Sequence, residues 1–324
     1  MSKRRIHRQS NGAIEQPSKH RGLMVIFVVI SLIAASAVFA QWRNGVSKGG
    51  GNIQPQNPPM TTQSLTTASK EYIYAGGKLI ATEESPATHH ASTIGAYDPS
   101  AGIFYLRNSN TFGIADLIVP YGGTPWKPVV GDWDGNGTTT IGIYDPVSTN
   151  FYLRNTNSTG TPDITIAFGG ANWVPIAGDW DGDGTTTIGI YDPTTTNFHL
   201  RSSNGPSATI LSIPFGGANW IPLAGDWDGD GTTTIGVYDP SAAIFYLRSS
   251  NGPSATILSI PFGGANWRPV VGDWDGNGTT TIGIFDPATT NFHLRNTNST
   301  GTPDISVPFG GGSWFPIAGD WDGL

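Results

Sequence analysis

A strict 47-residue period runs through the last 230 or so residues of the chain, and it constrains the fold more than any other feature. Three short motifs recur on this period without an insertion or deletion. Gly-Asp-Trp has its Asp at Asp132, Asp179, Asp226, Asp273 and Asp320; (Tyr/Phe)-Asp-Pro has Asp98, Asp145, Asp192, Asp239 and Asp286; Leu-Arg has Arg107, Arg154, Arg201, Arg248 and Arg295. Five copies of one unit therefore occupy residues 91–324, and such units bury their faces by stacking on one another.

Hydrophobic alternation within a unit predicts four short strands. In the second copy these are residues 140–144, 150–154, 163–168 and 173–180, separated by turns rich in Gly, Pro, Asn and Asp. No segment of the unit has helical periodicity. Four strands in about 40–50 residues are typical of one propeller blade. We expect an all-β fold, a β-propeller of about five four-stranded blades.

An open array of stacked blades is the alternative to a closed ring. The repeats start in mid-unit at Ser92 and stop just after Gly319-Asp-Trp. These two ends are complementary, so they would meet in a ring, join head to tail in a filament, or continue into a longer array.

Composition excludes several classes of protein. The chain has no Cys, which excludes disulfide scaffolds, thiolate metal sites and cysteine nucleophiles. The net charge of −7 is unevenly distributed, because seven Lys and Arg against Glu15 give residues 1–43 a charge of +6 and leave −13 for the rest. Such an acidic body lacks the basic patch expected of a nucleic-acid-binding protein.

The N-terminal part predicts export. Residues 1–22 form a basic segment that stays in the cytoplasm, and residues 23–40 are an uncharged apolar run. This run is either a retained transmembrane signal anchor or a signal peptide cleaved after Ala40. Residues 41–90 read as a flexible linker, with a candidate hairpin at 71–82, before the repeat domain at 91–324. The predicted location is the cell surface, as a single-pass membrane protein with its N-terminus inside, or the extracellular space after cleavage.

An Asp-rich loop, Gly-Asp-Trp-Asp-Gly-(Asn/Asp)-Gly-Thr-Thr-Thr, is the one motif with clear chemistry. Carboxylate or amide oxygens stand at loop positions 1, 3 and 5, counted from the Asp of Gly-Asp-Trp, and Gly at positions 4 and 6 permits a tight turn. Hard oxygen ligands suit Ca²⁺, and position 7 offers a backbone carbonyl. The candidate ligands at these positions are Asp132, Asp134, Asn136 and Thr138; Asp179, Asp181, Asp183 and Thr185; Asp226, Asp228, Asp230 and Thr232; Asp273, Asp275, Asn277 and Thr279. The alternative is an Asx-turn loop whose Asp side chains bind only backbone amides.

The loop and its flanks resemble the FG-GAP or VCBS-type repeat, found in integrin heads and in many secreted bacterial proteins. The run PVVGDWDGNGTTTIGIYDP and the recurring Phe-Gly-Gly carry the resemblance over all five units, about 70% of the chain. It implies a calcium-supported β-propeller of cell-surface adhesion or recognition. One departure stands out, since the family's last ligand, an Asp at position 9, is replaced by Thr140, Thr187, Thr234 and Thr281. We expect modest calcium affinity, and tighter binding at the two loops with three Asp.

Other periodic residues have simpler interpretations. The Asp of (Tyr/Phe)-Asp-Pro is expected to cap a turn, the periodic Arg to pair with that Asp across the blade, and the periodic Trp to pack between blades. Sequons such as those at Asn157 and Asn298 permit glycosylation on an exported surface.

The repeated character of the polar residues argues against an enzyme, which needs an asymmetric set of acid, base or nucleophile. The sequence instead favours a membrane-tethered, calcium-binding recognition or adhesion module for an extracellular glycan or protein. A self-assembling subunit of an extracellular filament or surface layer is the first alternative, and a lectin-like five-bladed propeller without metal is the second.

Overall fold

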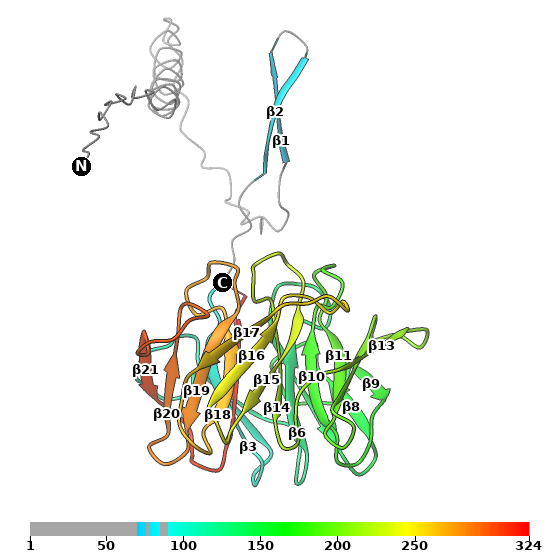
Figure 1. Ribbon diagram of the computed structural model, residues 1–324. Helices are drawn as coiled ribbons and strands as arrows, with labels where there is room; N and C mark the ends of the chain where they lie inside the picture. The colour runs from blue at the N-terminus through cyan, green and yellow to red at the C-terminus, as the bar shows by residue number, and fades with distance from the viewer. Residues whose placement is uncertain (1–69, 76–77, 85–89, 324) are drawn as a thin grey trace, which may run out of the picture. The chain divides into compact units, whose positions relative to one another are not determined.

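The computed structural model describes residues 70–75, 78–84 and 90–323 of the chain. Over 90–323 the chain forms five four-stranded antiparallel sheets arranged as the blades of a propeller (Figure 1). We number the blades in chain order. The prediction of an all-β propeller of five four-stranded blades is confirmed.

Blade 1 consists of β22 (Phe315–Gly319), β3 (Thr93–Asp98), β4 (Ile103–Leu106) and β5 (Leu117–Pro120). Blade 2 consists of β6 (Lys127–Gly131), β7 (Thr140–Asp145), β8 (Asn150–Leu153) and β9 (Ile164–Ala167). Blade 3 consists of β10 (Val174–Gly178), β11 (Thr187–Asp192), β12 (Asn197–Arg201) and β13 (Ile210–Pro214). Blade 4 consists of β14 (Ile221–Gly225), β15 (Thr234–Asp239), β16 (Ile244–Arg248) and β17 (Ile257–Pro261). Blade 5 consists of β18 (Arg268–Gly272), β19 (Thr281–Asp286), β20 (Asn291–Leu294) and β21 (Ile305–Pro308).

The ring closes through a sheet shared by the two ends of the repeat region. Strand β22, the last in the chain, pairs with β3, the first of the propeller, in a register that sets Gly319 opposite Thr93 and Phe315 opposite Tyr97. Blade 1 therefore takes its innermost strand from the far end of the sequence. The complementarity of the two ends, visible in the sequence, is realised within one molecule as a closed ring rather than as an open array.

The second strand of each blade is buried on both faces, because a neighbouring blade covers each side. In β7 every residue is buried, and Ile141 and Ile143 pack with blade 1 while Tyr144 packs with blade 3. Tyr144 also contacts Phe151 of the adjacent strand, with ring centroids 4.8 Å apart. The same pair of buried aromatic rings recurs in every blade. The core thus consists of five equivalent layers between blades.

A separate two-stranded hairpin precedes the propeller in the sequence. Strands β1 (Lys70–Ala75) and β2 (Lys78–Glu84) pair antiparallel, which confirms the hairpin expected around Gly76 and Gly77. The basic segment, the apolar run at 23–40 and most of the linker lie outside the described residues. Within the ranges that are described, the chain has no helix of the length and apolarity required to cross a membrane.

Candidate metal loops and the polar residues around them

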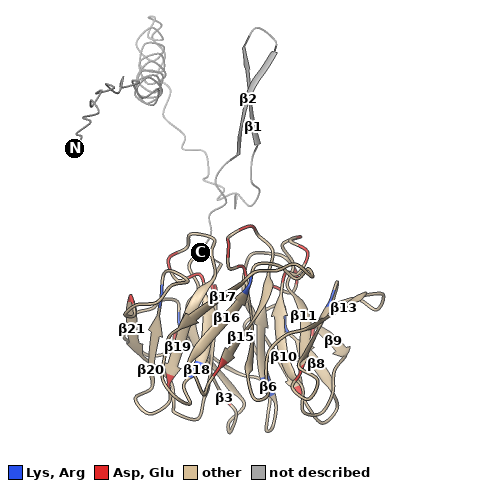
Figure 2. Cartoon of the chain, viewed as in Figure 1, with Lys and Arg blue, Asp and Glu red and all other residues tan. Residues whose placement is uncertain are grey.

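Four Asp-rich loops join the first and second strands of a blade, and the fifth begins directly after β22, so all of them lie on one face of the propeller. Figure 2 shows acidic residues gathered on the loops at this face. In blade 2 the loop connects β6 to β7, and Gly135 and Gly137 take φ values of 70° and 91°. These left-handed conformations cost glycine little, which explains why Gly stands at positions 4 and 6.

The first Asp of the loop organises the turn through backbone amides. Asp179 accepts hydrogen bonds from the N–H groups of Gly182 at 2.8 Å, Asp183 at 3.1 Å and Gly184 at 2.7 Å. Position 5 adds an Asx turn, since Asp183 Oδ1 accepts from the amide of Thr185 at 2.8 Å. The loops that begin at Asp132, Asp226 and Asp273 repeat this arrangement. Hydrogen bonds within the protein therefore hold the loop in this conformation.

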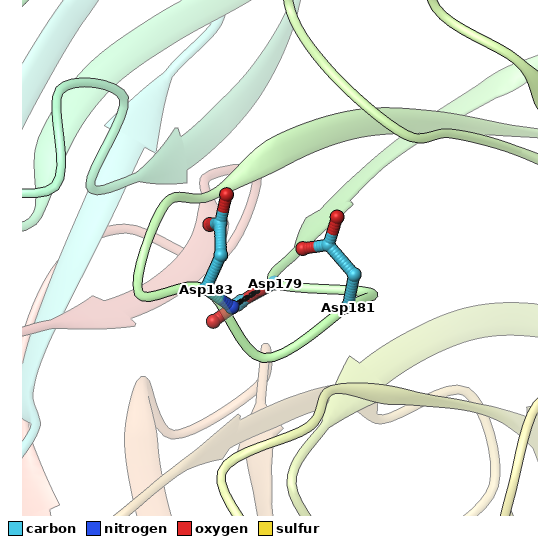
Figure 3. Close-up of side chains that lie close together, drawn as sticks. All are labelled: Asp179, Asp181 and Asp183. Carbon is cyan, nitrogen blue, oxygen red and sulfur yellow. Dashed lines mark hydrogen bonds between the residues drawn. The ribbon is translucent and has the colours of Figure 1, made fainter.

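Two of the loops also bring three carboxylates together. In blade 3 one oxygen from each of Asp179, Asp181 and Asp183 lies within 4.8 Å of the others (Figure 3), and Asp226, Asp228 and Asp230 do the same in blade 4. Figure 3 shows Asp181 and Asp183 extending from opposite sides of the loop. In the loops of blades 2 and 5, Asn136 and Asn277 replace the third carboxylate.

The clustered negative charge perturbs these acids. Desolvation, followed by the negative charges of Asp183 and Asp179, raises the pKa of Asp181 above its usual value. Desolvation likewise raises the pKa of Asp226, against the opposing effect of its backbone hydrogen bonds and with a further increase from Asp230. A bound cation would remove this like-charge repulsion.

The threonines at loop positions 7 and 9 differ in burial and in hydrogen-bond partners. At position 7, Thr138, Thr185, Thr232 and Thr279 are half-buried and donate their amide N–H to the side chain at position 5. At position 9, Thr140, Thr187, Thr234 and Thr281 are buried at the start of the second strand. Their hydroxyls donate to backbone carbonyls, as Thr140 Oγ1 does to Gly131 O at 3.1 Å. The structure thus brings positions 1, 3 and 5 together and places the hydroxyl of position 9 on a different partner.

Position 8 links each loop to its neighbour, a role that the sequence analysis did not assign. The amide of Asp132 donates to Thr186 Oγ1 of blade 3 at 3.0 Å, and the amide of Thr186 donates back to Asp132 O at 2.7 Å. All five junctions have this reciprocal pair, with Ser92 in place of Thr opposite Asp273. The signal in the sequence was the unbroken Thr-Thr-Thr run after each loop.

The fifth loop, at the end of the described chain, contains Asp320 and Asp322. Asp320 accepts from the amide of Gly323 at 3.0 Å, and its carboxylate lies 3.5 Å from His90 Nδ1. Desolvation raises the pKa of Asp320, and the charge of His90 opposes that rise.

The Asp of (Tyr/Phe)-Asp-Pro caps a turn on the opposite face, as predicted. Asp286 accepts from the hydroxyl of Thr289 at 2.7 Å and from the amide of Ala288 at 2.9 Å. The hydrogen bond from the Thr289 hydroxyl is the largest influence on the pKa of Asp286, which is lowered. The equivalent acids in the other blades bind the residues that follow them in the same way.

The expected pairing of the periodic Arg with these acids is wrong. Arg154 lies at the other end of its strand and pairs instead with Asp163, nine residues later, at 2.9 Å. Arg107 and Arg295 pair with Asp116 and Asp304 at 3.7 and 3.1 Å. Arg154 Nη1 also donates to Thr161 O at 2.5 Å, so the guanidinium orders the loop between the third and fourth strands. The prediction failed because the Asp and the Arg stand at opposite ends of neighbouring antiparallel strands.

The periodic Trp that precede the first strands are half-buried, and each stacks on another ring. Trp267 stacks on His293 with centroids 5.3 Å apart, and a Cβ added at Gly264 would lie 2.9 Å from the indole. Equivalent Trp stack on Tyr or His in the other blades. Because Gly264 and the His293 ring both contact Trp267, the structure agrees with its interpretation as a packing residue.

Comparison with known proteins finds no protein-family model and no curated protein that matches this chain. The five-bladed architecture is consistent with propeller repeats in general, and the resemblance to FG-GAP or VCBS repeats stays an interpretation of the motif.

Proposed function

We propose that this protein is an exported binding module of the cell surface or extracellular space, with a non-enzymatic propeller whose Asp-rich loops bind Ca²⁺. The observation that supports calcium is the convergence of three carboxylates within 4.8 Å in each of the loops at 179–183 and 226–230. The cation would be held by the carboxylates of positions 1, 3 and 5 and by the backbone carbonyl of position 7. It would be a structural ion that neutralises the loop and stiffens the face on which it lies.

The hydrogen bonds within the loop are compatible with this proposal. A carboxylate has two oxygens with about four acceptor sites, and the three amide bonds to Asp179 leave capacity on that group. The side chains of Asp181 and Asp183 are exposed, so they can reorient toward an ion at little cost. Ion binding and Asx-turn formation then act on the same loop conformation.

The recognition role rests on repetition. Five similar loops on one face offer a partner several equivalent contacts, which raises avidity without a specialised catalytic centre. The apolar run at 23–40 supports export and, if it is retained, a membrane tether. An extracellular glycan or protein is the proposed partner, and a nucleic acid is disfavoured by the charge of −13 outside the first 43 residues.

Calorimetric titration of the full chain with CaCl₂ after chelator treatment tests the calcium site. We expect binding in the range of roughly 10⁻⁴–10⁻³ M and a rise in Tm with added Ca²⁺. The double variant Asp181→Asn with Asp228→Asn should weaken binding at blades 3 and 4. Glu83→Gln with Glu84→Gln, on strand β2 and outside the loops, is the matched control for loss of two carboxylates. The absence of calcium heat together with an unchanged Tm would reject the calcium site.

A further inference from the structure

The five periodic arginines end the third strand of a blade or directly follow it, and their guanidinium groups do not all have the same partners. In blades 1, 2 and 5 the Arg pairs with an Asp nine residues later, at N···O distances of 3.7, 2.9 and 3.1 Å. In these pairs the Arg side chains are only 6–10% exposed, whereas the Asp side chains are 41–45% exposed. The guanidinium is thus the inner member of the pair, and the carboxylate position is open to solvent.

Blades 3 and 4 have the same loop length but no acid at this position. Ile210 and Ile257 stand where the other blades have Asp, paired across the sheet with Arg201 and Arg248 and each 52% exposed. Within the part of the chain that the structure describes, no ion pair joins either Arg to a carboxylate. The change follows from the run RSSNGPSATILSIPFGGANW, which these two units share.

The two unpaired arginines retain free donors. Arg201 donates from Nε to Ser203 O at 3.3 Å and from Nη2 to Gly205 O at 2.6 Å. Its Nη1, the atom that binds the carboxylate in the other blades, makes no hydrogen bond with any residue that the structure describes. Arg248 repeats this pattern with Ser250 and Gly252. The side chains are partly exposed, so a ligand can reach the free nitrogen.

The surroundings of both guanidinium groups favour an anion with an apolar neighbour. The Arg201 guanidinium lies 5.3 Å from the ring centroid of Phe168 and that of Arg248 lies 5.2 Å from Phe215, so an aromatic face from the preceding blade keeps water from one side. Burial lowers the pKa of both arginines, but an Arg stays charged at neutral pH. A charge-assisted bond gains strength in such a partly dry place.

We propose that Arg201 and Arg248 each bind the carboxylate of an external ligand, in the position that Asp116, Asp163 and Asp304 fill in the other three blades, with an apolar group of the ligand against Ile210 or Ile257. A carboxylate beside an aliphatic group, as at the C-terminus of a peptide, has this chemistry. The inference names a ligand class for the binding module proposed above and rests on that proposal. Its site is separate from the calcium loops, so the two can fail independently.

The two sites lie on adjacent blades, one repeat apart. A single, partly exposed Arg–carboxylate contact contributes little binding free energy, so each site alone is weak. A ligand with two carboxylates at a matching separation would bind more tightly through an increased effective concentration.

Ligand-observed saturation-transfer NMR on the full chain tests the proposal with N-acetyl-leucine as the probe. N-acetyl-leucinamide has the same apolar group without the charge, and glucuronate has the charge without the apolar group. We expect transfer to N-acetyl-leucine and at least about tenfold weaker binding of the amide. Equal binding of the amide, or tighter binding of glucuronate, would overturn the assignment.

The repeats themselves supply the decisive variants. Ile210→Asp with Ile257→Asp restores the internal carboxylate of the other blades and should abolish binding of N-acetyl-leucine. Ile210→Asn with Ile257→Asn is the matched neutral control. It removes the apolar contact without adding a charge, so it should weaken binding of N-acetyl-leucine but keep the preference for the carboxylate over the amide. Because neither change touches the arginines or their carbonyl partners, both variants should fold. Undiminished binding to the Asp variant would overturn the proposal. Calcium titration of the same samples reports on the loops separately, since loss of calcium binding with retained N-acetyl-leucine binding rejects only the metal site.

Discussion

Asp132 of blade 2 and Thr186 of blade 3 exchange two hydrogen bonds, from Asp132 N–H to Thr186 Oγ1 at 3.0 Å and from Thr186 N–H to Asp132 O at 2.7 Å. The Cγ2 methyl of Thr186 also lies against Gly131, where an added Cβ would come within 2.4 Å of it. The residue that starts each candidate metal loop is therefore fixed by the next blade, and the loops form a continuous ring on one face.

Replacing Thr186 by Val should destabilise the propeller. The substitution keeps the shape but removes the acceptor for the Asp132 amide, which would cost about 1 kcal/mol of the free energy of unfolding. Chemical denaturation measures the change. Thr186→Ser is the control, because Ser92 serves in the equivalent junction opposite Asp273. Equal stability of the Val and Ser variants would show that the hydroxyl contributes nothing at this junction.

Much of the fold was accessible from the sequence because the period has no insertions. Once one unit is divided into strands, the division applies to all five, and the second copy gave strand positions close to β7, β8, β9 and β10. The complementary ends were compatible with a ring, a filament or a longer array, and the pairing of β22 with β3 shows the ring. The regular period thus indicated which distant segments have the same structure, which a single sequence does not usually show.

The polar partners were harder to predict. Hydrophobic alternation shows on which face of the sheet a side chain lies, but it does not show which polar side chains meet at one end of the sheet. The prediction therefore paired Arg154 with the Asp of (Tyr/Phe)-Asp-Pro instead of with Asp163. Asp163 and its absence in two units are visible when the loops are aligned, since Ile210 stands at the same distance from its Arg. The position of Thr140 was also beyond sequence reasoning, because its hydroxyl is directed to Gly131 O across the strand pair.

Calcium affinity should follow the number of carboxylates in each loop. Asn136→Asp gives the loop of blade 2 the acidic set of blade 3, and we expect about tenfold tighter binding there, since an added ligand charge strengthens a site. Calorimetry would show an additional site of the tighter class. The reciprocal variant, Asp183→Asn, should remove one. An unchanged calcium affinity in both variants would show that these loops do not bind the ion.

Asp286 should make the protein sensitive to acid. Its pKa in the folded protein is below the usual 3.8, so its stabilising effect is complete above that value and is lost as the pH falls toward the folded-state pKa. Asp286→Asn keeps one of the two acceptor oxygens and removes the charge, and we expect it to lower the free energy of unfolding at pH 6 by about 1 kcal/mol. The difference between the two proteins should shrink as the pH falls below 3.8 toward the folded-state pKa. Urea denaturation at several pH values measures it, and a constant difference would contradict the linkage.

Ionised Asp181 should lower the stability of the calcium-free protein at neutral pH, in contrast to Asp286. Its pKa is raised in the folded protein, so ionisation costs stability as the pH rises from the usual 3.8 through the folded-state value. In calcium-free buffer at pH 7, Asp181→Asn should increase the free energy of unfolding by roughly 0.5 kcal/mol or less, because the side chain is exposed and its charge is screened. Excess Ca²⁺ should reverse the order, if the loop binds the ion, since the wild-type protein alone then has the full ligand set. The same order of stability with and without Ca²⁺ would speak against this loop as a site.

The sequons at Asn157 and Asn298 should stay unmodified once the propeller has folded. Asn157 Nδ2, the atom to which a glycan would be attached, donates to Thr139 O at 2.9 Å and to Trp321 O at 3.2 Å, and Asn298 Nδ2 donates to Thr280 O at 2.8 Å. Attachment would remove a donor hydrogen and push the sugar into the junction between two loops. Peptide-level mass spectrometry of the protein made in a glycosylating host should therefore show no glycan at either position. Full occupancy of Asn157 in a folded wild-type protein would contradict the prediction, since it would show that the sugar is accommodated without these hydrogen bonds.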